Sequence, residues 1–153
     1  MIVAEEVSTA LSEGRAVVAL ESTIISHGLP TESSARVARE IEASVRDWAA
    51  VPATIAIVDG RVRVGLDDSA LDRIATDAKV VKSSIRDLGA VMASGGLGAT
   101  TVASTAYLAH RSGIAVFATG GLGASIAAPT RALTSQRTCL RSPISLWPWS
   151  APG

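Results

Sequence analysis

Several features that mark other classes of protein are scarce in this chain of 153 residues. It has a single cysteine, Cys139, so an internal disulfide is excluded and a reducing compartment is expected. Lysine and arginine together number 14, as do aspartate and glutamate, and no basic stripe indicates DNA or RNA binding. No apolar run approaches the roughly 20 residues of a membrane span. Since Glu5 and Glu6 also stand where a signal peptide would be apolar, we expect a soluble cytoplasmic protein without nucleic-acid or membrane partners.

Aromatic residues make up only 3% of the chain, although 48% of it is hydrophobic. The core must therefore consist of Ala, Val, Leu and Ile, which suits buried parallel strands and close helix packing. The length is sufficient for one domain with a substantial core.

Alternating patterns along the first part of the chain predict an α/β fold with a largely parallel sheet. Strands are expected at 16–20, 53–58, 61–65, 79–81 and 114–118, and helices at 3–11, 31–50, 69–76, 84–93 and 99–111. The apolar face of the helix at 31–50 is assigned to Val37, Ile41, Val45 and Trp48. Asp59-Gly60 between two strands predicts a hairpin, the one antiparallel pair expected.

Ligands in such sheets bind beyond the carboxyl ends of the strands, where the sequence places Glu21, Lys82 and a glycine loop at 119–123. A carboxylate beside apolar residues, as at Glu21, is suited to donating a proton, but it can equally cap a helix or pair with a lysine. Lys82 is placed to bind a phosphate or sugar oxygen, or is simply a solvated charge. His27, in a predicted loop, could bind a phosphate or be structural.

Small and hydroxyl residues cluster at Gly98-Ala99-Thr100-Thr101-Val102-Ala103-Ser104-Thr105. We predict a loop that leads into a helix, whose free amides and hydroxyls suit an oxyanion. Close helix packing also requires small residues, so this alternative stays open. The cluster matches neither the Walker pattern nor the Rossmann fingerprint.

Taken together, these segments resemble the pseudouridine-5′-phosphate glycosidase family, also called indigoidine synthase A-like. The segments that match, in the family's order and spacing, are Ala19 to Gly28, Val51 to Ile57, Lys82 with Arg86-Asp87-Leu88, Gly98 to Thr105, and Val116 to Gly123. The resemblance covers about residues 2–123, the N-terminal part of a family member.

The resemblance implies an α/β/α sandwich, assembled as a homotrimer with Mn²⁺, that reversibly splits pseudouridine 5′-phosphate into uracil and ribose 5-phosphate. The family opens the ribose ring and holds C1′ as an imine (Schiff base) on a lysine. By motif, Glu21 moves protons, Lys82 binds the substrate and Val102 contributes at the substrate. In the family, the aspartate that holds the metal and the lysine that forms the imine follow the last matching segment. This chain has neither of these two residues.

The two parts of the chain are therefore expected to differ: 1–123 as the N-terminal part of the glycosidase domain, and 124–153 as an aberrant, poorly ordered tail. If the codons for Ala124 to Thr130 are read in a frame that begins one base earlier, they can encode the motif that comes next in the family. This suggests a frameshift near codon 124. We expect an inactive enzyme fragment. The alternatives are a non-catalytic module for sugar-phosphate binding or assembly, and a non-functional relic.

Overall fold

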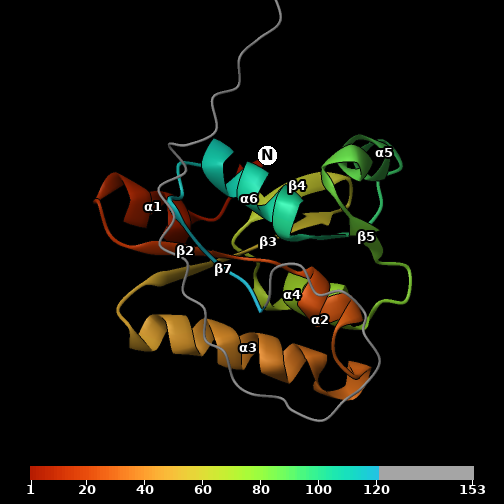
Figure 1. The fold of residues 1–153 in the computed structure, drawn as a ribbon, viewed down its shortest axis with the longest axis horizontal. Helices are drawn as coiled ribbons and strands as arrows, with labels where there is room; N and C mark the ends of the chain where they lie inside the picture. Colours follow the sequence, from red (N-terminus) through yellow and green to blue (C-terminus); the bar gives the residue numbers. More distant parts are fainter. Residues whose placement is uncertain (121–153) are drawn as a thin grey trace, which may run out of the picture.

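The computed structural model describes residues 1–120, which form a sheet of seven strands with helices on both faces (Figure 1). The strands are β1 (Ile2–Val3), β2 (Val17–Leu20), β3 (Val51–Val58), β4 (Arg61–Val64), β5 (Val81–Ser83), β6 (Gly98–Thr100) and β7 (Val116–Ala118). The helices are α1 (Glu5–Ser12), α2 (Thr23–His27), α3 (Thr31–Asp47), α4 (Asp68–Thr76), α5 (Leu88–Ala93) and α6 (Val102–Arg111), with a 3-10 turn η1 (Ile85–Asp87). Residues 121–123 of the glycine loop and the predicted tail at 124–153 lie outside the described residues.

The helices form two layers, with α1, α5 and α6 on one face of the sheet and α2, α3 and α4 on the other. The predicted α/β/α sandwich is therefore confirmed. Within the described part, none of the helices combines the length and apolarity that crossing a bilayer requires.

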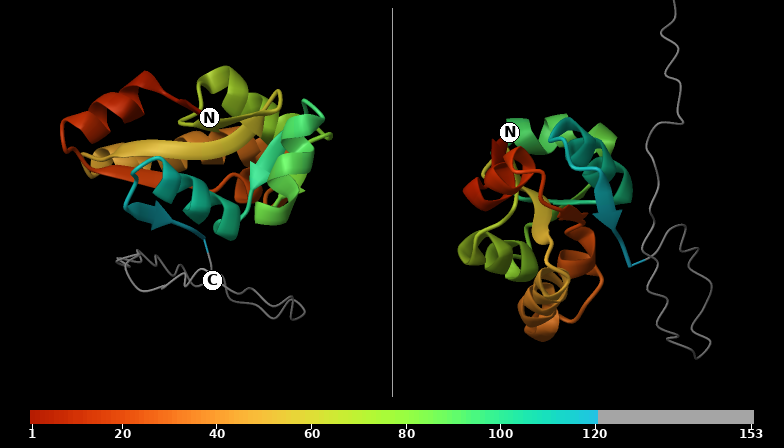
Figure 2. Two further views of the ribbon diagram at one scale, coloured as in Figure 1. Left: turned by 90° about the horizontal axis from the view of Figure 1, so that it is seen from above. Right: turned by 90° about the vertical axis from the view of Figure 1, so that its left-hand side faces the viewer.

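Strand β3 is the centre of the sheet, and all eight of its residues are buried. The main path through the sheet is β1-β4-β3-β2-β7. Residues 51–54 of β3 pair in parallel with β2, whereas residues 56–57 pair antiparallel with β6, which in turn pairs in parallel with β5. Figure 2 shows β3 as a long curved strand through the middle of the molecule. The prediction of a single antiparallel pair is thus wrong, since β3 makes one with β4 and another with β6.

The predicted hairpin joins β3 and β4 through Asp59 and Gly60, whose φ angles are 52° and 70°. Two consecutive positive φ angles characterise the type I′ turn, and glycine adopts such an angle without strain. The hairpin prediction is confirmed.

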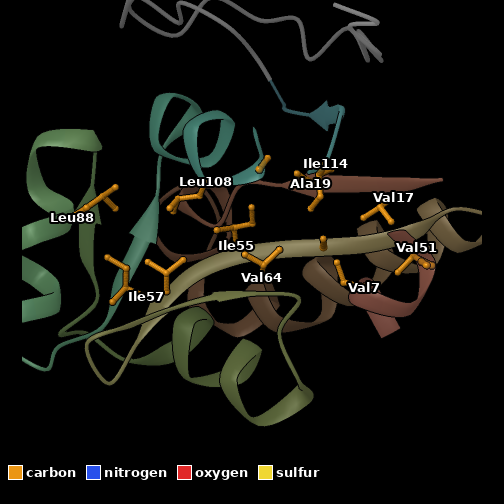
Figure 3. Close-up of a cluster of buried hydrophobic side chains, with 14 of the residues drawn as sticks. Val7, Val17, Ala19, Val51, Ile55, Ile57, Val64, Leu88, Leu108 and Ile114 are labelled. Atoms are coloured by element: carbon orange, nitrogen blue, oxygen red, sulfur yellow. The ribbon is translucent and has the colours of Figure 1, made fainter. Parts of the chain in front are cut away.

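The largest cluster of buried side chains lies between the sheet and helices α1, α5 and α6 (Figure 3). Its members are aliphatic, as the scarcity of aromatics predicts, and Phe117 of β7 packs against it only partly buried. Trp48, which the sequence analysis assigns to the apolar face of α3, follows the helix as its cap residue and is 81% exposed. That assignment is wrong for Trp48.

Three local predictions also need correction. Thr23 to His27 form helix α2 rather than a loop. Gly98 to Thr100 form strand β6 rather than the predicted loop and first residues of a helix. Strand β5 begins at Val81, so Lys82 lies inside the strand and Ser83 ends it.

Gly98 has no room for a side chain, and this predicts a large difference between two glycine substitutions. A Cβ at Gly98 would lie 2.6 Å from Ser83 Oγ, 3.0 Å from Val91 Cγ1 and 3.1 Å from Ile57 Cδ1, whereas a Cβ at Gly89 in α5 would meet nothing within 4 Å. Gly98→Ala is expected to cost about 1–3 kcal/mol through overpacking. Gly89→Ala is expected to be neutral or to stabilise by up to about 1 kcal/mol. Urea unfolding of both variants checks this, and equal free energies of unfolding would contradict it.

Candidate active site

Glu21 and Thr119 meet where β2 and β7 end. These parallel strands pair Leu20 with Ala118, so the next residue of each strand emerges at the same point. The Thr119 hydroxyl donates a hydrogen bond of 2.6 Å to Glu21 Oε1, and both residues are partly buried. Within residues 1–120, Glu21 neither forms an ion pair nor caps a helix. The two structural roles considered for this carboxylate, capping a helix and pairing with a lysine, are therefore not seen in the described part of the chain.

The next residue, Ser22, belongs to a buried junction where β3 changes partners. Strand β2 pairs with β3 as far as Thr54 and β6 pairs with it from Ala56, so the carbonyl of Ile55 lies between the two ladders. Ser22 Oγ and Thr100 Oγ1 both donate to this carbonyl, at 2.7 and 2.6 Å, and the Thr100 amide donates to Ser22 Oγ at 2.8 Å. Two hydroxyls thus satisfy a buried acceptor that neither strand reaches, and they bring the ends of β2 and β6 together.

Most hydroxyls in the segment from Gly98 to Thr105, which is predicted to bind an oxyanion, make hydrogen bonds within the fold. Ser104 Oγ donates to the Ser83 carbonyl at 2.6 Å and accepts from the Thr101 amide at 2.9 Å, which completes a capping box at the start of α6. Thr105 Oγ1 donates to Thr100 Oγ1 at 2.9 Å. Because the side chains of Thr100, Ser104 and Thr105 are fully buried, they are not available to a ligand. This part of the oxyanion prediction is wrong.

What remains accessible at this point is the beginning of α6 and the edge of β5. Helix α6 begins at the partly buried Val102, whose amide belongs to the first turn and so has no partner within the helix. Lys82 is exposed, in register with Ala99 of the neighbouring strand β6. Within residues 1–120 its side chain makes no ion pair, and no side-chain hydrogen bond joins it to Glu21. Glu21 and Val102 thus follow the carboxyl ends of β2 and β6, and Lys82 lies one residue before the end of β5.

His27 is the exposed last residue of α2. The helix ends at Gly28, where a Cβ would lie 2.8 Å from the Ile24 carbonyl oxygen. The local sequence therefore places the imidazole at a helix end facing solvent, and its predicted phosphate-binding role stays a prediction.

A further carboxylate, which the local sequence does not reveal, contacts β3 at Thr54, the register partner of Leu20 at the end of β2. Glu42 of α3 accepts a hydrogen bond from the buried Thr54 hydroxyl of β3. Burial raises the pKa of the Glu42 carboxyl above its ordinary value, while the Thr54 hydrogen bond and the charge of Arg46 oppose the rise. Asp68 and Glu6 add to it. Only the tertiary packing of α3 on β3 reveals this group, because the local sequence presents Glu42 as a polar helix position.

The raised pKa of Glu42 predicts a stability that depends on pH. The folded state holds the proton more tightly than the unfolded state, so this contribution is greatest in acid and is lost as pH rises through the folded-state pKa. Glu42→Gln keeps an acceptor for Thr54 and should raise the urea midpoint at about pH 7 but not at about pH 4. Glu6 should change the stability with pH in the opposite direction, because its hydrogen bonds from Arg46 lower its pKa. Glu6→Gln should therefore lower the midpoint near neutrality only, and the same sign for both variants would contradict this account.

The described residues do not fit a manganese site. No group of three or more His, Cys, Asp or Glu side chains that could hold a metal ion occurs within residues 1–120.

Comparisons with known proteins agree on one family. The family model described as "Indigoidine synthase A like protein" matches residues 6–129, a segment that ends beyond Gly123. A pseudouridine-5′-phosphate glycosidase of Streptomyces griseus is 57% identical over 113 residues, which are 74% of this chain and 35% of the relative. One of Salinispora tropica is 60% identical over 109 residues, covering 71% of this chain and 34% of the relative. The chain thus spans about a third of the length of these curated relatives.

Solved structures give the same result. The prealnumycin C-glycosynthase AlnA, in complex with ribulose 5-phosphate, has a TM-score of 0.69 and 49% sequence identity over 78% of this chain and 38% of that one. An indigoidine synthase A-like protein from Thermotoga maritima has a TM-score of 0.66 and 32% identity over 71% of this chain and 37% of that one. With the fold, the order of the motifs and the family model in agreement, the chain belongs to the indigoidine synthase A-like family.

Proposed function

We propose that this chain carries the N-terminal part of a pseudouridine-5′-phosphate glycosidase active site. The reaction is the reversible cleavage of the C–C glycosidic bond, which gives uracil and ribose 5-phosphate. Glu21 moves the proton, and Lys82 and the start of α6 at Val102 bind the substrate. The observation that carries this proposal is the Glu21 carboxylate, held at a strand end by Thr119 at 2.6 Å.

The chemistry of the glutamate supports this assignment. As the bond between C1′ and uracil breaks, its electron pair stays with the uracil carbon, which must gain a proton. A carboxyl group within reach of that carbon supplies the proton, and in the reverse direction the carboxylate removes it. The names of the relatives, pseudouridine-5′-phosphate glycosidase, point to the same reaction.

A chimera tests the proposal, with residues 1–120 of this chain replacing the matching part of the Streptomyces griseus relative. We expect it to release uracil from pseudouridine 5′-phosphate. A folded chimera without this activity would reject the proposed role of the segment. Light scattering on the same protein tests the homotrimer that the family resemblance implies.

We further propose that the 153-residue chain by itself has little or no lyase activity. The imine lysine and the metal aspartate follow Gly123 in the family, and residues 124–153 contain neither lysine nor aspartate. The manganese expected by resemblance then lacks the family's aspartate ligand.

A second candidate function, the binding of a sugar phosphate without turnover, is favoured by the exposed Lys82 on β5. If it is correct, calorimetry will detect ribose 5-phosphate binding to the chain. Lys82→Ala should then weaken this binding about 10–100-fold, as expected for a lost hydrogen bond to a charged group. Lys79→Ala removes an exposed lysine near the start of the same strand and should have no effect. Equal effects of the two substitutions would indicate a general charge effect and contradict a Lys82 site.

A further inference from the structure

The pairing of β2 with β7 fixes more than the position of Glu21. Since Leu20 and Ala118 are register partners, Thr119, the residue that follows β7, stands beside Glu21. The distance of 2.6 Å between Thr119 Oγ1 and Glu21 Oε1 lies in the range of charge-assisted O–H···O⁻ hydrogen bonds. Sequence order alone does not suggest this contact, because the two residues are 98 positions apart.

The two oxygens of the Glu21 carboxyl group are therefore not equivalent. Oε1 accepts the Thr119 hydroxyl, whereas none of the side-chain hydrogen bonds within residues 1–120 involves Oε2. Because Oε1 already accepts the Thr119 hydroxyl, Oε2 is the oxygen left to exchange a proton with a substrate. The torsions of the glutamate side chain are also restrained, since Thr119 holds one oxygen of the carboxyl group.

We propose that Thr119 is a positioning residue, which holds Oε1 of Glu21 and so assigns proton transfer to Oε2. This inference rests on the proposed function of Glu21. In the cleavage direction the Oε2–H bond breaks and its proton forms the new C–H bond on uracil with the electron pair of the former C–C bond. At C1′ the nitrogen of an amine supplies an electron pair and forms a C–N bond, the bond from C1′ to the ring oxygen breaks, and that oxygen takes a proton from the nitrogen, which leaves C1′ as a protonated imine. Glu21 remains as a carboxylate that accepts the Thr119 hydroxyl. In the synthetic direction Oε2 takes the proton back.

Two substitutions separate the hydroxyl from the shape of the side chain. Thr119→Val keeps the shape and removes the donor, whereas Thr119→Ser keeps the donor. By NMR of the full 153-residue chain we expect a slowly exchanging Thr119 hydroxyl proton coupled to the Glu21 carboxyl group, and a single Glu21 rotamer. Thr119→Val should lose the proton and average the rotamers, and Thr119→Ser should restore both signals. A single Glu21 rotamer in the valine variant would overturn the proposal.

The chimera supplies the kinetic readout. Thr119→Val should lower kcat about 10–100-fold with KM changed less than about twofold, since misplacement of a reacting group reduces the chemical step. Thr119→Ser should recover most of kcat. If the chimera with Thr119 is inactive, the proposed function fails while the NMR result still decides whether Thr119 positions Glu21. If it is active and the valine variant keeps its kcat, the positioning role fails and the proposed function stands.

Discussion

Replacing Glu21 by glutamine is expected to lower the kcat of the chimera by about 10²–10⁴-fold, the usual contribution of a positioned general acid or base. Glutamine retains the size of the side chain and an oxygen that accepts the Thr119 hydroxyl, but it cannot give or take the proton. KM should change little, because the substitution removes proton transfer rather than binding. Uracil release under saturating substrate measures the effect.

Glu13→Gln is the matched control for this prediction. Glu13 precedes the opposite end of β2, and within residues 1–120 its exposed side chain pairs only with Arg15. The control should keep the activity of the chimera. A Glu21→Gln chimera that retains its kcat would remove Glu21 from the mechanism.

Removing the side chain of Ile57 is expected to have the largest effect on stability among the substitutions considered. Ile57 lies in the central strand β3, is fully buried, and belongs to the main core cluster (Figure 3). Ile57→Ala should cost about 2–5 kcal/mol, because it loses apolar burial and leaves a cavity. Since domains of this size are stable by about 5–15 kcal/mol, this loss is a large fraction of the total.

Urea unfolding of Ile57→Ala, Ile57→Val and Ile85→Ala tests this prediction. The valine variant should cost about 0.5–1.5 kcal/mol, since it removes one methyl group. Ile85 in η1 is 49% exposed, so its replacement by alanine should cost about 0.5 kcal/mol or less. Equal losses for Ile57→Ala and Ile85→Ala would mean that the sheet does not pack as described.

The sequence predicts the elements that local patterns determine and misses those that distant contacts create. Asp59-Gly60 predicts its turn because the two residues themselves favour positive φ angles. Helix α2 has only five residues and no periodicity, and its first residue is held by a hydrogen bond from Thr23 Oγ1 to the Thr100 carbonyl, 77 positions away. Strand β6 looks like a helix start because its small residues suit either structure. Its pairing with β3 and β5 decides the outcome.

The candidate site divides in the same way. A strand followed by Glu21 predicts a carboxylate at the rim of the sheet, but only the strand order reveals that Thr119 stands beside it. The hydroxyls of Thr100 and Ser104 resemble ligand-binding groups in the sequence. The structure shows that they satisfy buried backbone groups at the partner change of β3 and at the start of α6. Residue type alone does not separate these two uses, because both need a small side chain with a hydroxyl.

Uracil release from pseudouridine 5′-phosphate, measured side by side for the purified 153-residue chain and for the chimera, distinguishes a partial active site from a complete one. We expect release by the chimera and no release above the uncatalysed rate by the chain. Turnover by the chain at a rate comparable to the chimera would contradict the claim that Glu21 and Lys82 need groups from the rest of the family's fold.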